Sequence, residues 1–168
     1  MRELVAGHHT NVFLKPGEAV FSRHPILVST ILGSCISVTM FSPARGVGAI
    51  CHAMFPRAAP NQTSLYYVEP ALRYIYRKMQ ANKAVDDLEV KLFGGAAVLG
   101  GPGQAEPSKG VGEQNLAAAV RVLQELGLKI LKQDTGGTRG RKIHFSMKTG
   151  DVYLRRLRQN DAALYWER

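Results

Sequence analysis

Residues 26–55 read ILVSTILGSCISVTMFSPARGVGAICHAMF, an apolar and β-branched run that two turn signals interrupt. A glycine–serine pair separates a strand predicted over residues 26–31 from one over residues 35–41, where polar and apolar side chains alternate. Residues 42–46, SPARG, place proline and glycine where a chain reverses. A further strand is predicted over residues 47–55, so the last two strands are expected to pair as a hairpin.

The rest of the chain mixes helices with strands. Apolar residues recur every three or four positions over residues 65–79, which predicts an amphipathic helix. Pro70 delays its ordered start to Tyr67 or later, because proline is tolerated only in the first turn. Asn115 is expected to cap a second helix, which ends at Gly127. The other predicted elements are strands before residue 26, strands over 88–93, 128–131, 143–147 and 152–157, a turn over 134–141, and a glycine- and proline-rich loop over 96–112.

Length and composition are typical of a globular protein. The chain has 168 residues, of which 45% are hydrophobic and 21% charged, and it can bury a sizeable core. No repeat or linker divides it, so we expect a single α+β domain over residues 1–168 with about two long helices. The longest apolar stretches, roughly ten residues, are too short to span a bilayer. Residues 1–15 contain no apolar run of the secretory type, so the cytoplasm is the expected location.

Cys35 is the first candidate for chemistry. The chain has two cysteines, Cys35 and Cys51, too few for a disulfide scaffold or a CxxC-type zinc site, and no other spacing predicts a metal or a cofactor. Cys35 follows Gly33 and Ser34 at the head of a predicted strand, where backbone N–H groups of the turn would stabilise an oxyanion. A free cysteine in this position is either a nucleophile or, as most are, a small buried apolar residue.

His52 is the candidate base for that nucleophile. It lies on the returning strand of the predicted hairpin, and imidazole is the group that most often takes a thiol proton. Neighbouring strand residues point to opposite faces, so Cys51 is expected to pack in the core while His52 lies beside Cys35. A third polar group should orient the ring, and strand parity leaves Ser29 and Thr30 open. The alternative for His52 is an inert core histidine with satisfied hydrogen bonds.

Two glycine-rich segments have no established nucleotide motif. Neither Gly94-Gly95 nor Gly136-Gly137 belongs to a GxxxxGK[ST] or GxGxxG pattern. They either admit a substrate backbone closely or turn the chain tightly, and the tight turn is the simpler interpretation. Arg139 and Arg141 add positive charge that a phosphate or an acidic helix could meet, unless the loop is merely a solvated charged one.

Several motifs occur in a characteristic order over about residues 15–156. They are Leu32-Gly33-Ser34-Cys35, His52-Ala53-Met54-Phe55-Pro56, Lys91-Leu92-Phe93-Gly94-Gly95-Ala96, Gly112 with Asn115, Asp134-Thr135-Gly136-Gly137, and Gly140-Arg141-Lys142-Ile143 closing on Thr149-Gly150. As an ordered set they resemble the CheD family, the chemoreceptor glutamine deamidases of bacterial chemotaxis.

The resemblance implies a fold and an activity. The fold would be cysteine-hydrolase-like, with mixed β-sheets in layers and helices outside. The activity would be hydrolysis of selected glutamine side chains on cytoplasmic helices of methyl-accepting chemoreceptors, giving glutamate and ammonia. The family nucleophile falls on Cys35, the base on His52, and the third member on Thr30 or Ser29, with Thr30 favoured by residue type. Substrate or partner contacts are expected at Gly94, Gly95, Asn115, Gly136, Gly137, Arg139 and Arg141, and many family members also bind the phosphatase CheC.

Charge offers a competing hypothesis. The chain has 22 Lys and Arg against 13 Asp and Glu, a net charge of +9, which suggests an acidic partner. A non-catalytic basic module could bind nucleic acid, or serve as an adaptor for a chemoreceptor or CheC. No nucleic-acid signature is present and no membrane insertion is expected, so we predict an acidic protein partner. Residues 121–168 carry eleven basic and five acidic residues, and this region is the predicted docking surface for receptor helices.

The predicted docking surface can be tested by changing the salt concentration. Raising the ionic strength should weaken the encounter with receptor fragments, because added ions screen exposed charges over about 8–10 Å. Alkylation of Cys35 by a small neutral reagent should be nearly unaffected. Comparing both rates across a salt series checks the prediction, and an encounter rate that is independent of salt would argue against the docking surface.

Overall fold

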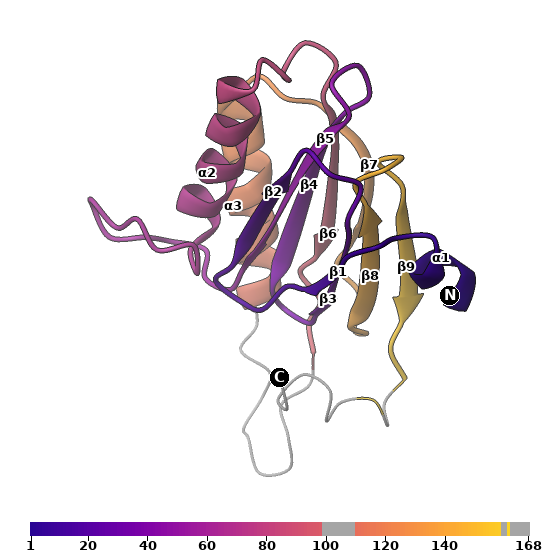
Figure 1. Ribbon diagram of the computed structural model, residues 1–168. Helices are drawn as coiled ribbons and strands as arrows, with labels where there is room; N and C mark the ends of the chain where they lie inside the picture. Colours follow the sequence, from indigo (N-terminus) through magenta and orange to yellow (C-terminus); the bar gives the residue numbers. More distant parts are fainter. Residues whose placement is uncertain (99–109, 159–160, 162–168) are drawn as a thin grey trace.

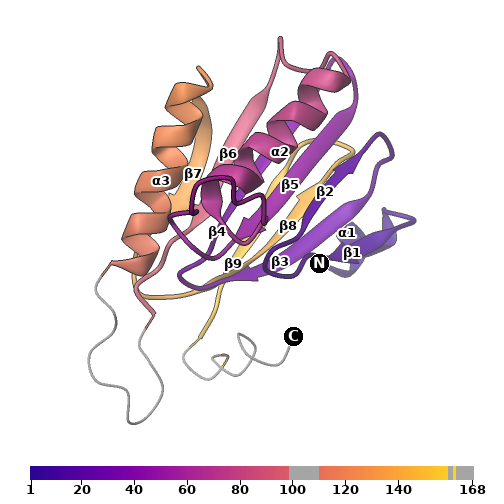
Figure 2. The same cartoon turned by 90° about the vertical axis from the view of Figure 1, so that its left-hand side faces the viewer.

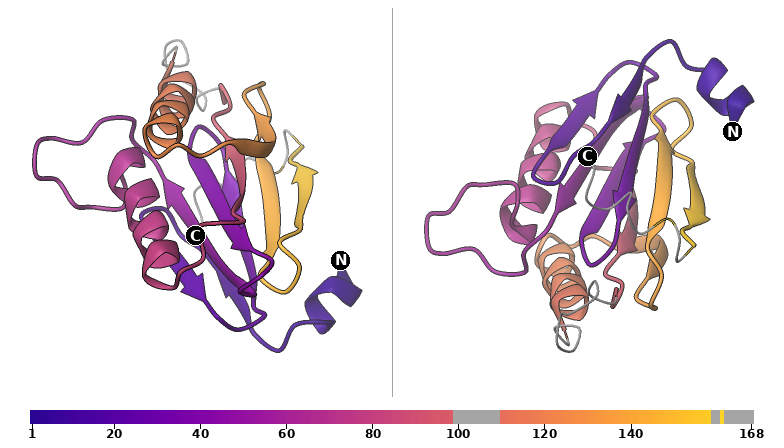
Figure 3. Two further views of the ribbon diagram at one scale, coloured as in Figure 1. Left: turned by 90° about the horizontal axis from the view of Figure 1, so that it is seen from above. Right: turned by 90° about the horizontal axis from the view of Figure 1, so that it is seen from below.

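The computed structural model describes residues 1–98, 110–158 and 161, and it has three layers (Figure 1). Two helices lie on one face of a five-stranded sheet, and a four-stranded sheet covers its other face (Figures 2 and 3). The helices are α2 (Val68–Ala81) and α3 (Val111–Glu125), and a short helix, α1 (Arg2–Ala6), precedes the first strand. Among the described residues, no helix is long and apolar enough to span a membrane.

Both sheets are mixed. The five-stranded sheet has the order β2 (Ala19–Ser22), β5 (Val47–Ala53), β4 (Ile36–Ser42), β6 (Glu89–Gly94) and β7 (Ile130–Thr135). The four-stranded sheet has the order β1 (Asn11–Phe13), β3 (Leu27–Leu32), β8 (Arg141–Ser146) and β9 (Val152–Arg156). Only the β1–β3 and β6–β7 pairs are parallel in the described part of the chain. The prediction of an α+β fold with layered mixed sheets is confirmed.

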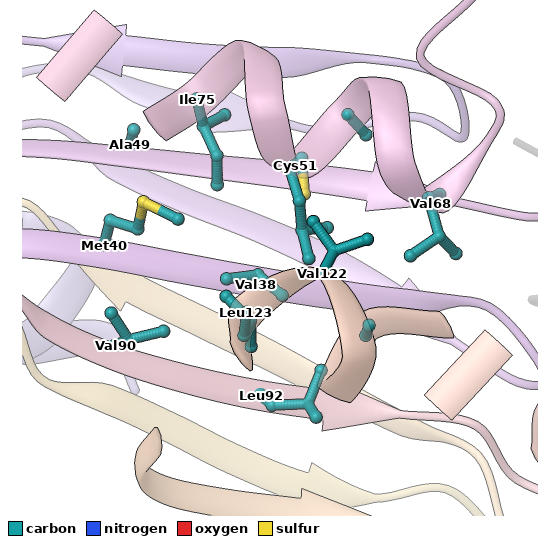
Figure 4. Packing of buried hydrophobic residues seen from close by; sticks show 14 of the residues in the cluster. Val38, Met40, Ala49, Cys51, Val68, Ile75, Val90, Leu92, Val122 and Leu123 are labelled. Carbon is teal, nitrogen blue, oxygen red and sulfur yellow. The ribbon is translucent and has the colours of Figure 1, made fainter. Parts of the chain in front are cut away.

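The predicted hairpin forms, as β4–β5, and it lies within the five-stranded sheet with a neighbour on each side. All seven residues of each strand are buried, and the pairing runs from Ser42 opposite Val47 to Ile36 opposite Ala53. One face of the hairpin contributes to a core beneath the two helices, and the other to a core between the two sheets. Cys51 lies on the helix-facing side, among apolar side chains such as Val38 and Val122 (Figure 4).

The predicted helix boundaries are partly right. Helix α2 begins at Val68, directly after Tyr67, and places Pro70 in its first turn, where a missing N–H costs little. Helix α3 ends before Gly127, which has φ +70° and lets the N–H of Leu128 donate to the carbonyl of Leu123.

Three predictions of local structure are wrong. Helix α3 begins at Val111, so Asn115 is an interior residue of the helix and not its cap. Residues 2–6 are helical where a strand was expected. Strand β7 extends to Thr135, into the predicted turn, because parallel pairing with β6 continues that far. Most of the predicted loop over 96–112 lies outside the described residues.

Candidate active site

Cys35 lies where the chain crosses from one sheet to the other. Strand β3 belongs to the four-stranded sheet and β4 to the five-stranded sheet, so residues 33–35 span the layer between them. The side chain is half-buried and packs at the margin of the core between the sheets. Unlike Cys51, which is fully buried, it is reachable from solvent.

Backbone bonds from the end of β6 hold this crossing. The N–H of Gly95 donates to the carbonyl of Cys35 at 2.8 Å, and that of Ala96 to the carbonyl of Gly33 at 2.9 Å. Gly94 has φ +106°, and a Cβ there would lie 2.1 Å from the Cys35 carbonyl oxygen, so only glycine fits. Gly94 and Gly95 therefore pack against the backbone of the candidate nucleophile, and their contact with substrate stays a prediction.

His52 faces the same interior layer as Cys35. Its pairing partner across the hairpin is Ser37, which has the same strand parity as Cys35. Cys35 directly precedes β4 and has the same parity as Ser37, so it lies diagonally across the end of the hairpin from His52. The ring is 2% exposed, and within the part of the chain that the structure describes its Nε2 makes no hydrogen bond.

Thr30 fixes the orientation and the tautomer of His52. The Thr30 hydroxyl donates to the carbonyl of Leu14 at 2.7 Å, and its Oγ1 lies 2.8 Å from His52 Nδ1. A hydroxyl has a single proton, so Nδ1–H must be the donor to Thr30 Oγ1 for both bonds to form. In the neutral ring the lone pair then resides on Nε2, the nitrogen that is free to accept a thiol proton.

Ser29 is excluded from this role. Its side chain has the opposite strand parity to Thr30, which pairs with Ile143 of the core between the sheets. Ser29 instead pairs with His144 and lies on the outer face of the four-stranded sheet. The alternative that Ser29 is the third member of the site is wrong, for this reason of parity.

Burial keeps both candidate catalytic groups neutral at pH 7. Burial lowers the pKa of His52 to about 4, against a smaller opposing effect from the Leu14 carbonyl. Burial raises the pKa of Cys35 to about 11, although its own backbone N–H opposes this. The free site therefore contains a thiol and a neutral imidazole rather than a preformed ion pair.

Asn115 is close to the candidate nucleophile but contacts no solvent. It is fully buried, and its Nδ2 donates to the carbonyls of Ser34 and Met54, each at 2.9 Å. The expectation that Asn115 binds substrate or a partner through its side chain is therefore wrong. Helical periodicity did carry the signal, since Asn115, Ala119 and Val122 lie on one buried face.

Arg141 is also buried rather than exposed to a partner. Its guanidinium donates to the carbonyls of Gly94, Asp134 and Gly136 and forms an ion pair with the Asp134 carboxylate at 2.9 Å. The prediction that Arg141 meets an external anion is wrong. Strand parity could have found this, because Arg141 shares a face with the core residues Ile143 and Phe145.

The second glycine pair braces the first. Gly136 and Gly137 both have φ +71°, as a tight turn requires. The N–H of Gly136 donates to the carbonyl of Gly94, and the carbonyl of Gly137 accepts from the N–H of Ala97. Arg139 is exposed, with Nε donating to the carbonyl of Leu157, and its contact with a partner stays a prediction.

Other predicted features of the site have no further support. The oxyanion role of the Gly33 and Ser34 backbone stays a prediction. Within residues 1–98, 110–158 and 161, no group of three His, Cys, Asp or Glu side chains could hold a metal ion. The carbonyl of Leu14, which completes the arrangement around His52, carried no sequence signal because it is a backbone atom.

Cysteine alkylation tests the two environments. Iodoacetamide should modify Cys35 well before Cys51, because Cys51 is fully buried and its pKa is raised to about 12. The Cys35 rate should rise with pH towards its pKa of about 11. Mass spectrometry after timed quenching measures both rates, and faster modification of Cys51 would contradict this arrangement.

The buried imidazole also makes stability depend on pH. The pKa of His52 falls from 6.5 to about 4 on folding, so the unfolded chain binds the proton more readily and folded-state stability is lost as pH falls from 6.5 to 4. The loss should reach about 3 kcal/mol, at 1.36 kcal/mol for each pH unit. Urea unfolding of wild type and His52→Gln over this range measures it. The exposed His9→Gln is the matched control, and equal slopes in wild type and His52→Gln would contradict the prediction.

Comparisons with known proteins identify the family of this chain. Residues 54–156 match the family model described as "CheD chemotactic sensory transduction", a match that begins just beyond His52. A probable chemoreceptor glutamine deamidase, CheD 2 of Geobacter sulfurreducens, is 41% identical over 152 residues, which cover 90% of this chain and 93% of the relative. The probable deamidase CheD of Maridesulfovibrio salexigens is 40% identical over 159 residues, which cover 89% and 93%. Since such similarity extends over nearly the whole length of both relatives, this chain belongs to the CheD family.

Proposed function

We propose that this chain is a chemoreceptor glutamine deamidase that works through Cys35 and His52. It hydrolyses the side-chain amide of receptor glutamines to glutamate and releases ammonia, within bacterial chemotaxis. Its relatives are named for this activity. The observation that carries the proposed mechanism is the Thr30–His52 hydrogen bond, which leaves Nε2 unprotonated on the face that His52 shares with Cys35.

The first half-reaction forms a thioester. As the Cys35 sulfur attacks the amide carbon, His52 Nε2 takes the thiol proton, so no free thiolate needs to accumulate. The carbonyl oxygen becomes an oxyanion, for which backbone N–H groups near Ser34 and Cys35 are the proposed donors. The imidazolium then gives its proton to the departing nitrogen, the C–N bond breaks, and ammonia leaves.

The second half-reaction regenerates the enzyme. His52 Nε2 removes a proton from water as the water attacks the thioester carbon. The C–S bond breaks, the imidazolium returns its proton to sulfur, and the product is a glutamate side chain. Over both halves one water is consumed, one amide becomes a carboxylate, and no redox partner is needed.

The group that orients the His52 ring is the Thr30 hydroxyl and not a carboxylate, which suits a neutral thiol and a neutral imidazole. Thr30 Oγ1 accepts a hydrogen bond from Nδ1–H and its hydroxyl donates one to the carbonyl of Leu14, so the ring is oriented without a negative charge beside it. The imidazolium is then not stabilised in the free enzyme, in agreement with the lowered pKa of His52. At pH 7 the proposed mechanism protonates His52 only during the reaction with a substrate amide.

The proposed substrate surface is less positive than the sequence count suggests. Of the basic residues after position 120, Arg141 is buried, and three others pair with acids: Arg121 with Glu125, Arg155 with Asp161 and Arg156 with Asp134. Exposed basic residues remain at both ends of the strands. Arg139 and Arg158 lie towards the end that carries Cys35, and Lys129 and Lys148 lie towards the opposite end. We propose that they receive acidic receptor helices in the cytoplasm. Binding of CheC is proposed on the family resemblance alone.

Ammonia release from purified receptor fragments tests the reaction. Cys35→Ala should abolish release, and His52→Gln should lower it by about 10²- to 10⁴-fold, the usual contribution of a general acid–base group. Thr30→Val keeps the shape but removes the acceptor, and should cost roughly tenfold, about one hydrogen bond. Coupled detection of ammonia together with mass spectrometry of the fragment measures each rate.

Cys51→Ala is the matched control. Cys51 lies on the opposite face of the same hairpin, so its loss should leave the rate per folded molecule unchanged. Full release by Cys35→Ala would refute the mechanism. Wild-type protein that binds receptor fragments without releasing ammonia would favour the adaptor alternative instead.

A further inference from the structure

Asn115 joins two segments that carry the proposed catalytic pair. Its Nδ2 donates to the carbonyl of Ser34, the residue before the nucleophile, and to that of Met54, two residues after the base. Both neighbours are acceptors, so the amide must present its NH₂ group to them. One fully buried side chain thus bonds at once to the strand ends that bear Cys35 and His52.

These two hydrogen bonds lie just beyond the end of the β4–β5 ladder. The β4–β5 ladder ends at Ile36 opposite Ala53, so Ser34 and Met54 lie just beyond its last backbone pair. There the two strands would separate, because β4 continues from the other sheet while the chain after β5 turns towards α2. The Asn115 amide ties the two segments beyond the end of the ladder.

Helix α3 is held close enough for this contact by a second glycine. A Cβ on Gly112 would lie 2.6 Å from the carbonyl oxygen of Gly95, so only glycine allows the helix to approach the end of β6. Gly95 in turn donates to the carbonyl of Cys35. The nucleophile segment is therefore held both by the residues at the end of β6 and by α3.

We propose that Asn115 is a positioning residue that sets the placement of Cys35 relative to His52. The inference rests on the proposed function only in taking these two groups as the reacting pair. Asn115 is fully buried and acts through the backbone, since its Nδ2 bonds go to the carbonyls of Ser34 and Met54. Without it, two carbonyls lose their donor and the thiol can move away from Nε2.

A double-mutant cycle on Cys35 alkylation tests the coupling without any receptor. At pH 7, His52→Gln should slow iodoacetamide modification of Cys35, because it removes the base. Asn115→Ala should slow it by about 10- to 100-fold, the cost of a displacement near 1 Å in a reacting pair. In the His52→Gln background the same substitution should add nothing, since the coupling that it disturbs is already absent.

Two further variants separate positioning from stability. Asn115→Asp keeps the volume but cannot donate to both carbonyls, so it should match Asn115→Ala even if the latter folds poorly. Val122→Ala removes buried methyl groups from the same helix away from the site, and should leave the alkylation rate per folded molecule unchanged. Thermal melts by circular dichroism supply the folded fraction of each variant.

The outcomes are distinct. Three results would each overturn the positioning role. The first is a wild-type rate of Cys35 alkylation in folded Asn115→Asp. The second is an equal slowing by Asn115→Ala with His52 present and in the His52→Gln background, and the third is no effect of His52→Gln on the rate. Absence of ammonia release by the wild type would overturn the proposed function instead, and the alkylation cycle would still decide the role of Asn115.

Discussion

The hydrogen bond between His52 Nδ1 and Thr30 Oγ1 joins the two sheets inside their shared core. His52 belongs to the five-stranded sheet and Thr30 to the four-stranded sheet, so neither side chain can be oriented without the packing of both layers. The Thr30 hydroxyl in turn donates to the carbonyl of Leu14, so the last acceptor in this series of hydrogen bonds is uncharged. The available lone pair and the proposed role of His52 depend on this arrangement, and burial in the same core lowers the pKa of His52.

The layer between the sheets gives the proposed reaction its electrostatic character. Protonating an imidazole that is 2% exposed costs desolvation free energy. The half-buried thiol of Cys35 has its pKa raised by burial and does not ionise near pH 7. Proton transfer during attack avoids both costs, because charge develops only while the bond to carbon forms. A solvent-exposed pair with a carboxylate partner would favour the opposite, preformed ion pair.

Glycines and buried polar side chains hold the nucleophile in place around this layer. Gly94 approaches the Cys35 backbone where a Cβ would collide, Gly95 donates to the Cys35 carbonyl, and Arg141 bonds to the carbonyl of Gly94. Asn115 of helix α3 donates to the carbonyl of Ser34, the residue before Cys35. These residues were expected at the surface because glycine, arginine and asparagine are usual there, but each satisfies backbone groups that a chain crossing between sheets leaves unpaired.

Local sequence determined the β4–β5 hairpin, the opposite facing of Cys51 and His52, and the start of α2 after Tyr67. These follow from side-chain periods of two and 3.6 residues and from proline geometry, which neighbouring residues suffice to define. Only the tertiary structure decided between Ser29 and Thr30, brought in the Leu14 carbonyl, and buried Arg141 and Asn115. Each of those outcomes depends on which sheet or helix packs against a given face, and contacts between segments 16 to 81 residues apart leave no periodic trace in the chain.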